Sequence, residues 1–271
     1  MNDIVRPIFK NDAFEEEISL NGFVKIKLFS TDLVEDLISK FNDTEKSSSK
    51  SGFYASIQNE NKTKVANFNT YFEDKVKQAT ENIFLNYNFL FVNFVVKNPQ
   101  PEGKVGLHQD WTYVDEKKFR SVNMWFPLIE TNEKNGGLKV LPKSHRLPLF
   151  LRSMPFDSEF YDKIEKETFT QLQNLTTKLG EVIIFDSRLL HCSGLNYTNK
   201  QRIACASIFI PEESQAFYYY KQNETLKRYK ANTIFFINLD INENEPSGDF
   251  SIIKDYKEVD ALEYINHLKT I

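Results

Sequence analysis

A histidine and an aspartate stand two positions apart in the segment VGLHQDWTY, residues 105–113. Residues i and i+2 of a strand point to the same face, so His108 and Asp110 can reach one bound ion together. A third candidate, His191, follows the apolar segment GEVIIFDSRLL. Two imidazoles and one carboxylate form a three-ligand metal site that leaves further coordination positions open. An HxD pair alone is weak evidence for such a site, because most pairs of this kind are unrelated surface residues.

The residue types in this set favour iron(II) chemistry. Neutral imidazoles and one carboxylate retain Fe(II) while cancelling only part of its charge. The open positions can then accept a bidentate 2-oxo acid and dioxygen, whereas a fourth protein ligand would close the site. The pattern is therefore typical of a non-haem iron oxygenase.

The segment HCSGLNYTNKQR at 191–202 resembles the second motif of the phytanoyl-CoA dioxygenase family, HxSxxNxTxxxR. The matching residues are His191, Ser193, Asn196, Thr198 and Arg202. The HQD at 108–110 matches the family's first motif, and NGGLKVLPKSH at 135–145 resembles its glycine turn, strand and proline-serine-histidine ending. Lys143 stands where the family usually has glycine, which leaves the form of this turn open. The resemblance extends over roughly residues 89–211.

The resemblance implies roles for the matched residues. The metal ligands would be His108, Asp110 and His191. Arg202 would form a salt bridge with the distal carboxylate of 2-oxoglutarate, helped by the Ser193 hydroxyl. Arginine suits this role because its planar guanidinium binds a carboxylate through two parallel hydrogen bonds.

Two of the implied binding residues also have a plainer interpretation. Trp125, within FRSVNMWFPLI, falls where the family places an aromatic ring beside the co-substrate, and it can equally be a core tryptophan. Arg202 begins the apolar segment RIACASIFIP, where a lone arginine can be an exposed strand end. Its spacing of eleven residues from His191 favours the co-substrate role.

The resemblance further implies a dioxygenase that uses Fe(II), 2-oxoglutarate and O2 to hydroxylate an unactivated C–H bond and releases succinate and CO2. The family's small-molecule substrates include amino acids, acyl thioesters and natural-product intermediates. Asp110 favours hydroxylation over halogenation, because related halogenases replace this carboxylate by a small residue. Desaturation, ring closure and epimerisation stay open as reaction outcomes.

Two rival functions are compatible with a metal-binding β core. One is a jelly-roll metalloenzyme of other, cupin-like chemistry that does not use 2-oxoglutarate. The spacing of Arg202 and Ser193 argues against it. The other is a non-catalytic jelly-roll binding module, and the intact set of three ligand residues argues against that function.

Local sequence patterns predict the elements at the N-terminal side. Residues 22–29, GFVKIKLF, alternate apolar and polar side chains like a strand, and Ser30 or Thr31 can cap a following helix. A second helix is predicted from residue 69 or 70 to about 85, with its apolar side chains facing inward.

From Phe89 onward, short β-rich runs separated by turn residues indicate an antiparallel sandwich or barrel. With the family resemblance, this predicts a mainly β fold with flanking helices, the double-stranded β-helix or cupin-like jelly roll. We expect one oxygenase domain over residues 1–271. Its parts are a helical N-terminal part at about 1–88, the jelly-roll core at about 89–211 and a C-terminal extension at about 212–271.

Two segments interrupt these patterns. The serine- and lysine-rich stretch 46–51 has no periodicity and is predicted to be a mobile surface loop. Residues 143–179 form a long insertion with a short helix, expected to decorate the rim of the core. Lys143, Arg146 and Arg152 in this insertion either contact an anionic substrate or are solvated charges.

Composition and charge exclude several classes of protein. The net charge of −4 and the absence of a long lysine or arginine cluster argue against a nucleic-acid partner. No window approaches the roughly 20 apolar residues of a membrane span, and the first twenty residues lack the apolar core of a signal peptide. Cys192 and Cys205 are expected to be buried free thiols. We therefore expect a cytoplasmic protein that acts on a small molecule.

Overall fold

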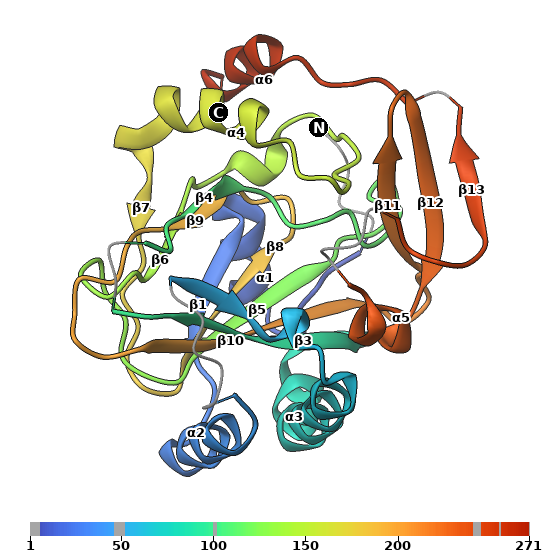
Figure 1. Ribbon diagram of the computed structural model, residues 1–271. Coiled ribbons are helices and arrows are strands. Elements are labelled where there is room, and N and C mark those ends of the chain that lie inside the picture. The colour runs from blue at the N-terminus through green and yellow to red at the C-terminus, as the bar shows by residue number, and fades with distance from the viewer. Residues whose placement is uncertain (1–5, 46–51, 100–101, 241–244, 255, 271) are drawn as a thin grey trace.

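The computed structural model describes residues 6–45, 52–99, 102–240, 245–254 and 256–270. Two β-sheets lie in the centre, helices cover both outer sides, and a third, smaller sheet stands at one edge (Figure 1). The segment 46–51, predicted to be a loop, lies outside the described residues. The mainly β architecture with flanking helices agrees with the fold class predicted from the sequence.

The larger sheet has six strands, all paired antiparallel. In spatial order they are β1 (Phe23–Lys27), β8 (Glu181–Asp186), β5 (Val122–Pro127), β10 (Arg202–Pro211), β3 (Tyr87–Lys97) and β2 (Phe53–Ala55). Most neighbours in this sheet are far apart in the sequence, as in a jelly roll. The predicted strand at 22–29 is present as β1.

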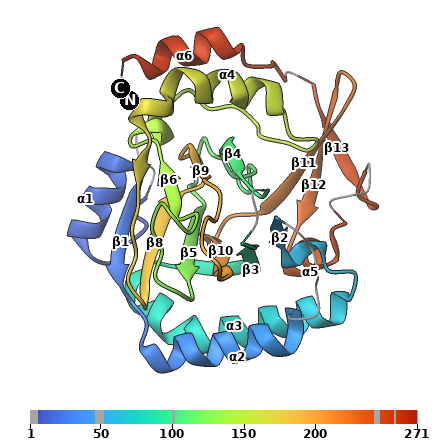
Figure 2. The ribbon, with the colours of Figure 1, turned by 60° about the vertical axis from the view of Figure 1, so that its left-hand side comes forward.

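The smaller sheet packs in front of the larger one (Figure 2). Its antiparallel strands are, in order, β4 (Val105–His108), β9 (His191–Ser193), β6 (Leu138–Val140) and β7 (Gln173–Asn174). Apolar side chains from both sheets fill the space between them, among them Trp125, Leu138, Val140, Ile183, Phe185 and Ala204. Two antiparallel sheets around a shared interior confirm the predicted jelly roll.

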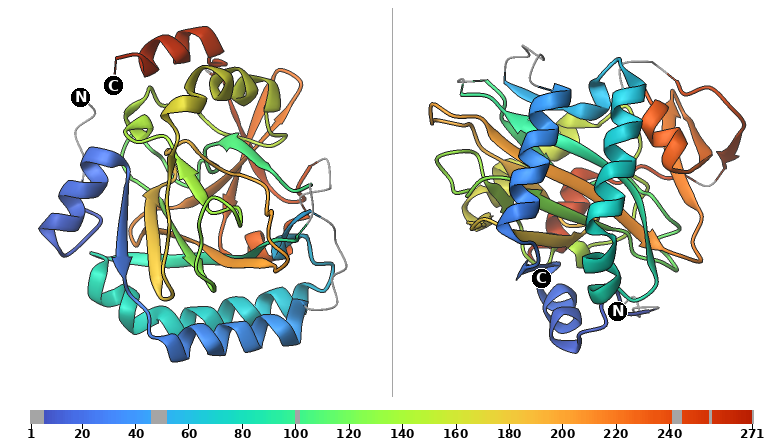
Figure 3. Two further views of the ribbon diagram at one scale, coloured as in Figure 1. Left: turned by 90° about the vertical axis from the view of Figure 1, so that its left-hand side faces the viewer. Right: turned by 90° about the horizontal axis from the view of Figure 1, so that it is seen from below.

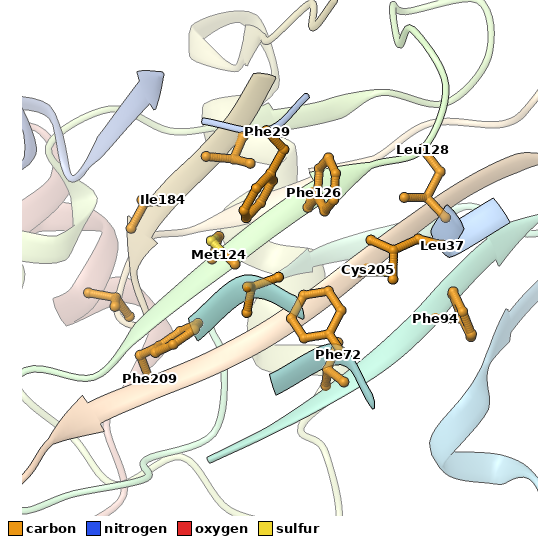
Figure 4. Packing of buried hydrophobic residues seen from close by; sticks show 14 of the residues in the cluster. Phe29, Leu37, Phe72, Phe94, Met124, Phe126, Leu128, Ile184, Cys205 and Phe209 are labelled. Atoms are coloured by element: carbon orange, nitrogen blue, oxygen red, sulfur yellow. The ribbon is translucent and has the colours of Figure 1, made fainter. Parts of the chain in front are cut away.

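Helices α2 (Thr31–Glu45) and α3 (Lys62–Ile83) run side by side across the outer face of the larger sheet (Figure 3). Ser30 caps α2 as predicted, because its hydroxyl accepts a hydrogen bond from the Leu33 amide at 3.3 Å. Phe68 on α3 stacks on Phe94 of β3 with ring centroids 3.9 Å apart. The resulting core is rich in phenylalanine (Figure 4). It also holds Cys205, one of the two buried free thiols.

The predicted start of α3 is wrong by about two turns. The helix begins at Lys62, because the Asn61 side chain accepts a hydrogen bond from the Lys64 amide and caps it there. Asn69, one of the two residues predicted to start this helix, instead lies inside it and is buried. Its side chain accepts from the Val92 amide and donates to the Val92 carbonyl, which ties α3 to β3.

The remaining elements surround the rim of the two central sheets. They are α1 (Asp12–Asn21), α4 (Ser158–Thr168), α5 (Thr233–Asn238), α6 (Ala261–Leu268), β11 (Ala216–Gln222), β12 (Thr225–Ala231) and β13 (Phe250–Ile253). Short 3-10 turns occupy Ser56–Gln58, Ser144–Arg146 and Phe169–Gln171. The predicted insertion supplies α4, which packs with α6 over β4, on the side opposite α2 and α3 (Figures 1 and 2). Among the described residues, no helix has the length and apolar character to cross a membrane.

Candidate metal centre

Strand pairing brings the three candidate ligands together. His108 ends β4 and His191 begins β9, and the two residues are direct partners in the ladder between these strands. Their ring centroids are 4.2 Å apart. Asp110 follows two residues after His108, and its Oδ1 lies 3.8 Å from Nε2 of His191. One ligand atom from each residue lies within 4.8 Å of the other two, a spacing that can hold a metal ion.

Both imidazoles are oriented through their Nδ1 atoms. Nδ1 of His108 lies 2.9 Å from the Gly106 carbonyl oxygen, and Nδ1 of His191 lies 2.9 Å from that of Leu189. A carbonyl can only accept, so Nδ1 carries the proton and Nε2 presents its lone pair. Burial lowers the pKa of both histidines well below the ordinary value, which keeps the imidazoles neutral and able to bind a cation.

The carboxylate of Asp110 is fixed by a residue that the sequence analysis missed. Nδ2 of Asn123 on β5 donates to Oδ2 of Asp110 at 3.0 Å, while Oδ1 faces His191. Burial raises the pKa of the Asp110 carboxyl, and the neighbouring His108 and the Asn123 hydrogen bond act in the opposite direction. Asn123 lies two residues before Trp125 on β5, so both side chains point to the same face of the strand. This spacing is the sequence signal that could have identified Asn123.

Arg152 holds the backbone of the segment that carries Asp110. Its Nε donates to the Asp110 carbonyl oxygen at 2.6 Å, and its two terminal nitrogens pair with the Glu116 carboxylate. Both charged side chains are almost completely buried. Burial of the Arg152 side chain therefore contradicts the prediction of a solvated charge.

The other two basic residues of the insertion lie at its start. Arg146 donates to the Ser19 carbonyl oxygen at 2.7 Å, so it ties the turn to the end of α1. Lys143 adopts the left-handed conformation with φ +69°, and its amide donates to the Asn21 carbonyl oxygen. The turn is kept although lysine replaces the glycine that this conformation favours.

Arg202 is the first residue of β10 and is only 2% exposed. It is thus not the exposed strand end that was the plainer prediction. Nη1 donates to the Val95 carbonyl oxygen at 3.0 Å, and the guanidinium lies 5.6 Å from the ring centre of Trp125. No carboxylate pairs with it among the described residues, and Nε has no hydrogen-bond partner there. Burial lowers its pKa to about 9.

Trp125 is a core residue, the plainer of the two interpretations, and it also lies next to Arg202. Its ring packs in the apolar cluster between the sheets and also lies beside the Arg202 guanidinium. Ser193 is buried at the end of β9, two residues after His191. The structure therefore buries Arg202, Ser193 and His191 of the second motif together with Trp125.

A second buried cation, Lys97, lies opposite Arg202 in the β3–β10 ladder. Its ammonium donates to the carbonyl oxygens of Gly103, Ser193 and Gly194 at 2.6, 3.0 and 2.6 Å. Burial and the charge of Arg202 lower its pKa to about 7. Lys97 was not recognised in the sequence, where it is only the last residue of an apolar run. Its contacts with Ser193 and Gly194 tie the end of β3 to the end of β9.

Two curated proteins match part of this chain in sequence. A "Probable alpha-ketoglutarate-dependent hypophosphite dioxygenase" of Stutzerimonas stutzeri is 29% identical over 126 residues, 44% of this chain and 44% of that protein. A "Phytanoyl-CoA dioxygenase domain-containing protein 1 homolog" of Dictyostelium discoideum is 25% identical over 134 residues, 47% of this chain and 48% of that protein. The chain thus spans about half the length of the curated relatives it matches.

Solved structures show the same fold at low sequence identity. The epimerase SnoN in complex with Fe3+, alpha ketoglutarate and nogalamycin RO has a TM-score of 0.59 and 12% identity, covering 90% of this chain and 95% of SnoN. HygX from Streptomyces hygroscopicus with nickel, 2-oxoglutarate and hygromycin B has a TM-score of 0.56 and 13% identity, covering 78% and 90%.

The match to a family model extends well beyond the two motifs. The model described as "Phytanoyl-CoA dioxygenase (PhyH)" matches residues 19–204, from the end of α1 to the start of β10. It therefore includes α2, α3 and most of both central sheets. The chain belongs to the phytanoyl-CoA dioxygenase family.

Proposed function

We propose that this protein is an Fe(II)- and 2-oxoglutarate-dependent oxygenase. His108, Asp110 and His191 bind the metal, and Arg202 binds the distal carboxylate of 2-oxoglutarate beside Trp125 and Ser193. The observation that carries the proposal is the buried Arg202 guanidinium, which has no counter-ion among the described residues. A buried unpaired charge is costly, so a site built around one favours an anionic ligand.

The residues present fit both the metal and the co-substrate. Two neutral imidazoles and one carboxylate suit Fe(II) and leave positions for a bidentate 2-oxo acid. Arg202 supplies a buried positive charge that has no carboxylate partner among the described residues, and this charge suits the distal carboxylate of 2-oxoglutarate.

When bound, the metal and 2-oxoglutarate supply the oxidising chemistry, in which 2-oxoglutarate and O2 yield succinate, CO2 and an oxidised substrate. The residues of the chain position and protect these reactants. Asn123 and the carbonyls of Gly106 and Leu189 fix the orientation of the three ligand side chains. The Arg152–Glu116 pair anchors the backbone at Asp110. The apolar side chains between the sheets exclude water from the site.

We further propose that the reaction is hydroxylation of a C–H bond of a small organic molecule. The intact Asp110 supports this, because its carboxylate fills the position that a halide would need. The fold is also used by an epimerase and a carbocyclase among the solved structures. Succinate release and product mass spectrometry with a panel of amino acids, thioesters and hydroxylated ring compounds will identify the outcome.

An anaerobic titration tests the proposed function directly. Adding Fe(II) and 2-oxoglutarate to the full chain should produce the visible metal-to-ligand charge-transfer band of a chelated 2-oxo acid. Succinate in place of 2-oxoglutarate is the matched control and should give no band, because it cannot chelate the metal through a 2-oxo group. Metal binding without the band would support the cupin-like alternative, and absence of metal binding would support the binding module.

Asn123→Ala should weaken metal binding although Asn123 itself is not a ligand. Loss of a partner that orients a ligand costs about 10–100-fold in metal affinity. The measurement is calorimetric titration with Mn(II), which does not oxidise during the experiment. Ser207→Ala is the control, because this buried hydroxyl on β10 bonds the Met124 carbonyl oxygen and not the ligand set. Equal Mn(II) affinity of Asn123→Ala and Ser207→Ala would contradict the role of Asn123.

A further inference from the structure

A cavity of about 380 Å³ lies beside Phe156, whose ring contacts the candidate ligand His108. Gln109, which stands between His108 and Asp110 in the sequence, forms part of the cavity wall. Phe156 forms another part, with its ring edge-on to His108 at 6.2 Å and stacked on Tyr161 at 4.9 Å. Phe156 is 42% exposed. A molecule in this cavity would contact the ring that packs against His108.

The cavity walls are rich in aromatic side chains. These are Trp111, Phe150, Phe156, Phe160, Tyr161 and Tyr256. Three separate parts of the chain supply them, which are the segment after β4, the insertion with α4 and the segment before α6. Aromatic walls of this kind favour a ring-containing ligand, because rings pack face to face or edge to face.

Each charged side chain in the cavity wall has a partner within the protein. Arg152 pairs with Glu116, and Lys221 pairs with Glu258. The Asp157 carboxylate accepts from the Phe160 amide as the cap of α4. Both basic side chains of the wall are thus paired with a carboxylate, and the exposed Asp157 carboxylate caps a helix, which argues against a charged ligand.

Two buried polar groups in the wall remain available for a ligand. The Gln109 side-chain oxygen has no donor, and the Tyr161 hydroxyl has no acceptor for its proton, among the described residues. Both residues are 5% exposed. Buried polar groups are normally satisfied, so a ligand with both a donor and an acceptor would complete them.

From these observations we infer that the cavity binds the substrate, and that the substrate is an uncharged, ring-containing small molecule with a hydroxyl or amide group. That this molecule is a substrate, and not only a ligand, rests on the proposed function. The Tyr161 hydroxyl and the Gln109 side-chain oxygen form hydrogen bonds with the polar group of the ligand. The aromatic walls pack against its ring beside Phe156.

Three probes of equal size test the ligand class: benzyl alcohol, benzoate and benzylammonium. Binding is measured by saturation-transfer NMR on the full chain, first loaded with diamagnetic Zn(II) and 2-oxoglutarate and then without them. Benzyl alcohol should bind, and the two ions should bind at least about tenfold more weakly, since burying an uncompensated charge is costly. Tighter binding of either ion, or no binding of benzyl alcohol, would overturn the inference.

Tyr161→Phe tests the polar contact, because it removes the hydroxyl and keeps the ring. It should weaken benzyl alcohol binding about fivefold, the effect of one neutral hydrogen bond. Tyr87→Phe is the control, because its hydroxyl donates to the Arg120 carbonyl oxygen and its side chain does not line the cavity. Wild-type affinity in Tyr161→Phe, or an equal loss in both variants, would remove Tyr161 from the site.

The experiment separates this inference from the proposed function. Failure of the charge-transfer titration with intact benzyl alcohol binding would reject the oxygenase and leave the cavity as a binding site for neutral rings. A normal charge-transfer band with no probe binding would reject the cavity assignment alone.

Discussion

Alanine at His108, Asp110 or His191 should abolish substrate oxidation and leave a folded protein. Each substitution removes one of the three protein ligands proposed for the metal, and no fourth candidate lies beside them in the described residues. The loss of affinity should exceed the about 10–100-fold that loss of an orienting partner costs. Mn(II) titration and turnover at sub-stoichiometric iron measure the effect, and circular dichroism checks the fold.

His267→Ala provides the matched control for the ligand variants. This histidine is exposed on α6, and its Nδ1 bonds only the Glu263 carbonyl oxygen. Its removal should leave Mn(II) affinity and turnover unchanged. Near wild-type turnover in any one of the three ligand variants would exclude that residue from the metal site.

Replacing Arg202 by methionine should sharply weaken binding of 2-oxoglutarate. Methionine keeps much of the side-chain bulk and removes the charge. Loss of a buried, charge-assisted pair should cost on the order of 2–5 kcal/mol. Since about 1.4 kcal/mol corresponds to one decade, the dissociation constant should rise at least tenfold. Mn(II) affinity should hardly change, because the three ligands are intact.

Two comparisons distinguish loss of the carboxylate contact from general damage. A 2-oxo acid that lacks the distal carboxylate should bind wild type and Arg202→Met about equally, whereas 2-oxoglutarate should discriminate strongly. The unliganded variant should unfold at no lower temperature than wild type, because the substitution removes a buried charge without a counter-ion. Equal 2-oxoglutarate affinity in both proteins would instead favour a metalloenzyme that does not use this co-substrate.

The local part of the fold could be predicted because its signals are local. The alternating residues of β1 and the cap at Ser30 depend on the conformation of a few neighbouring residues. The start of α3 could not be predicted in the same way. Several asparagines precede or interrupt its apolar stripe, and burial of Asn69 against β3 decides which of them caps the helix.

The sequence by itself identified three metal-ligand candidates and an arginine, since their types and spacings follow from the chemistry of a three-ligand site and the family motifs. Only the tertiary structure showed how these residues are supported. Asn123 and Lys97 lie on other strands, and each acquires its role from a partner distant in sequence.

The same holds for the cavity beside Phe156, which is formed by segments more than a hundred residues apart. No local sequence pattern indicates which buried charges of this protein have an oppositely charged partner. Arg152 is neutralised by Glu116, whereas Arg202 has no carboxylate partner among the described residues, although both are arginines in apolar surroundings. Ligand chemistry is thus determined by residue type and spacing, while the compensation of buried charge is decided by long-range packing, because it depends on which strands and loops the fold brings into contact.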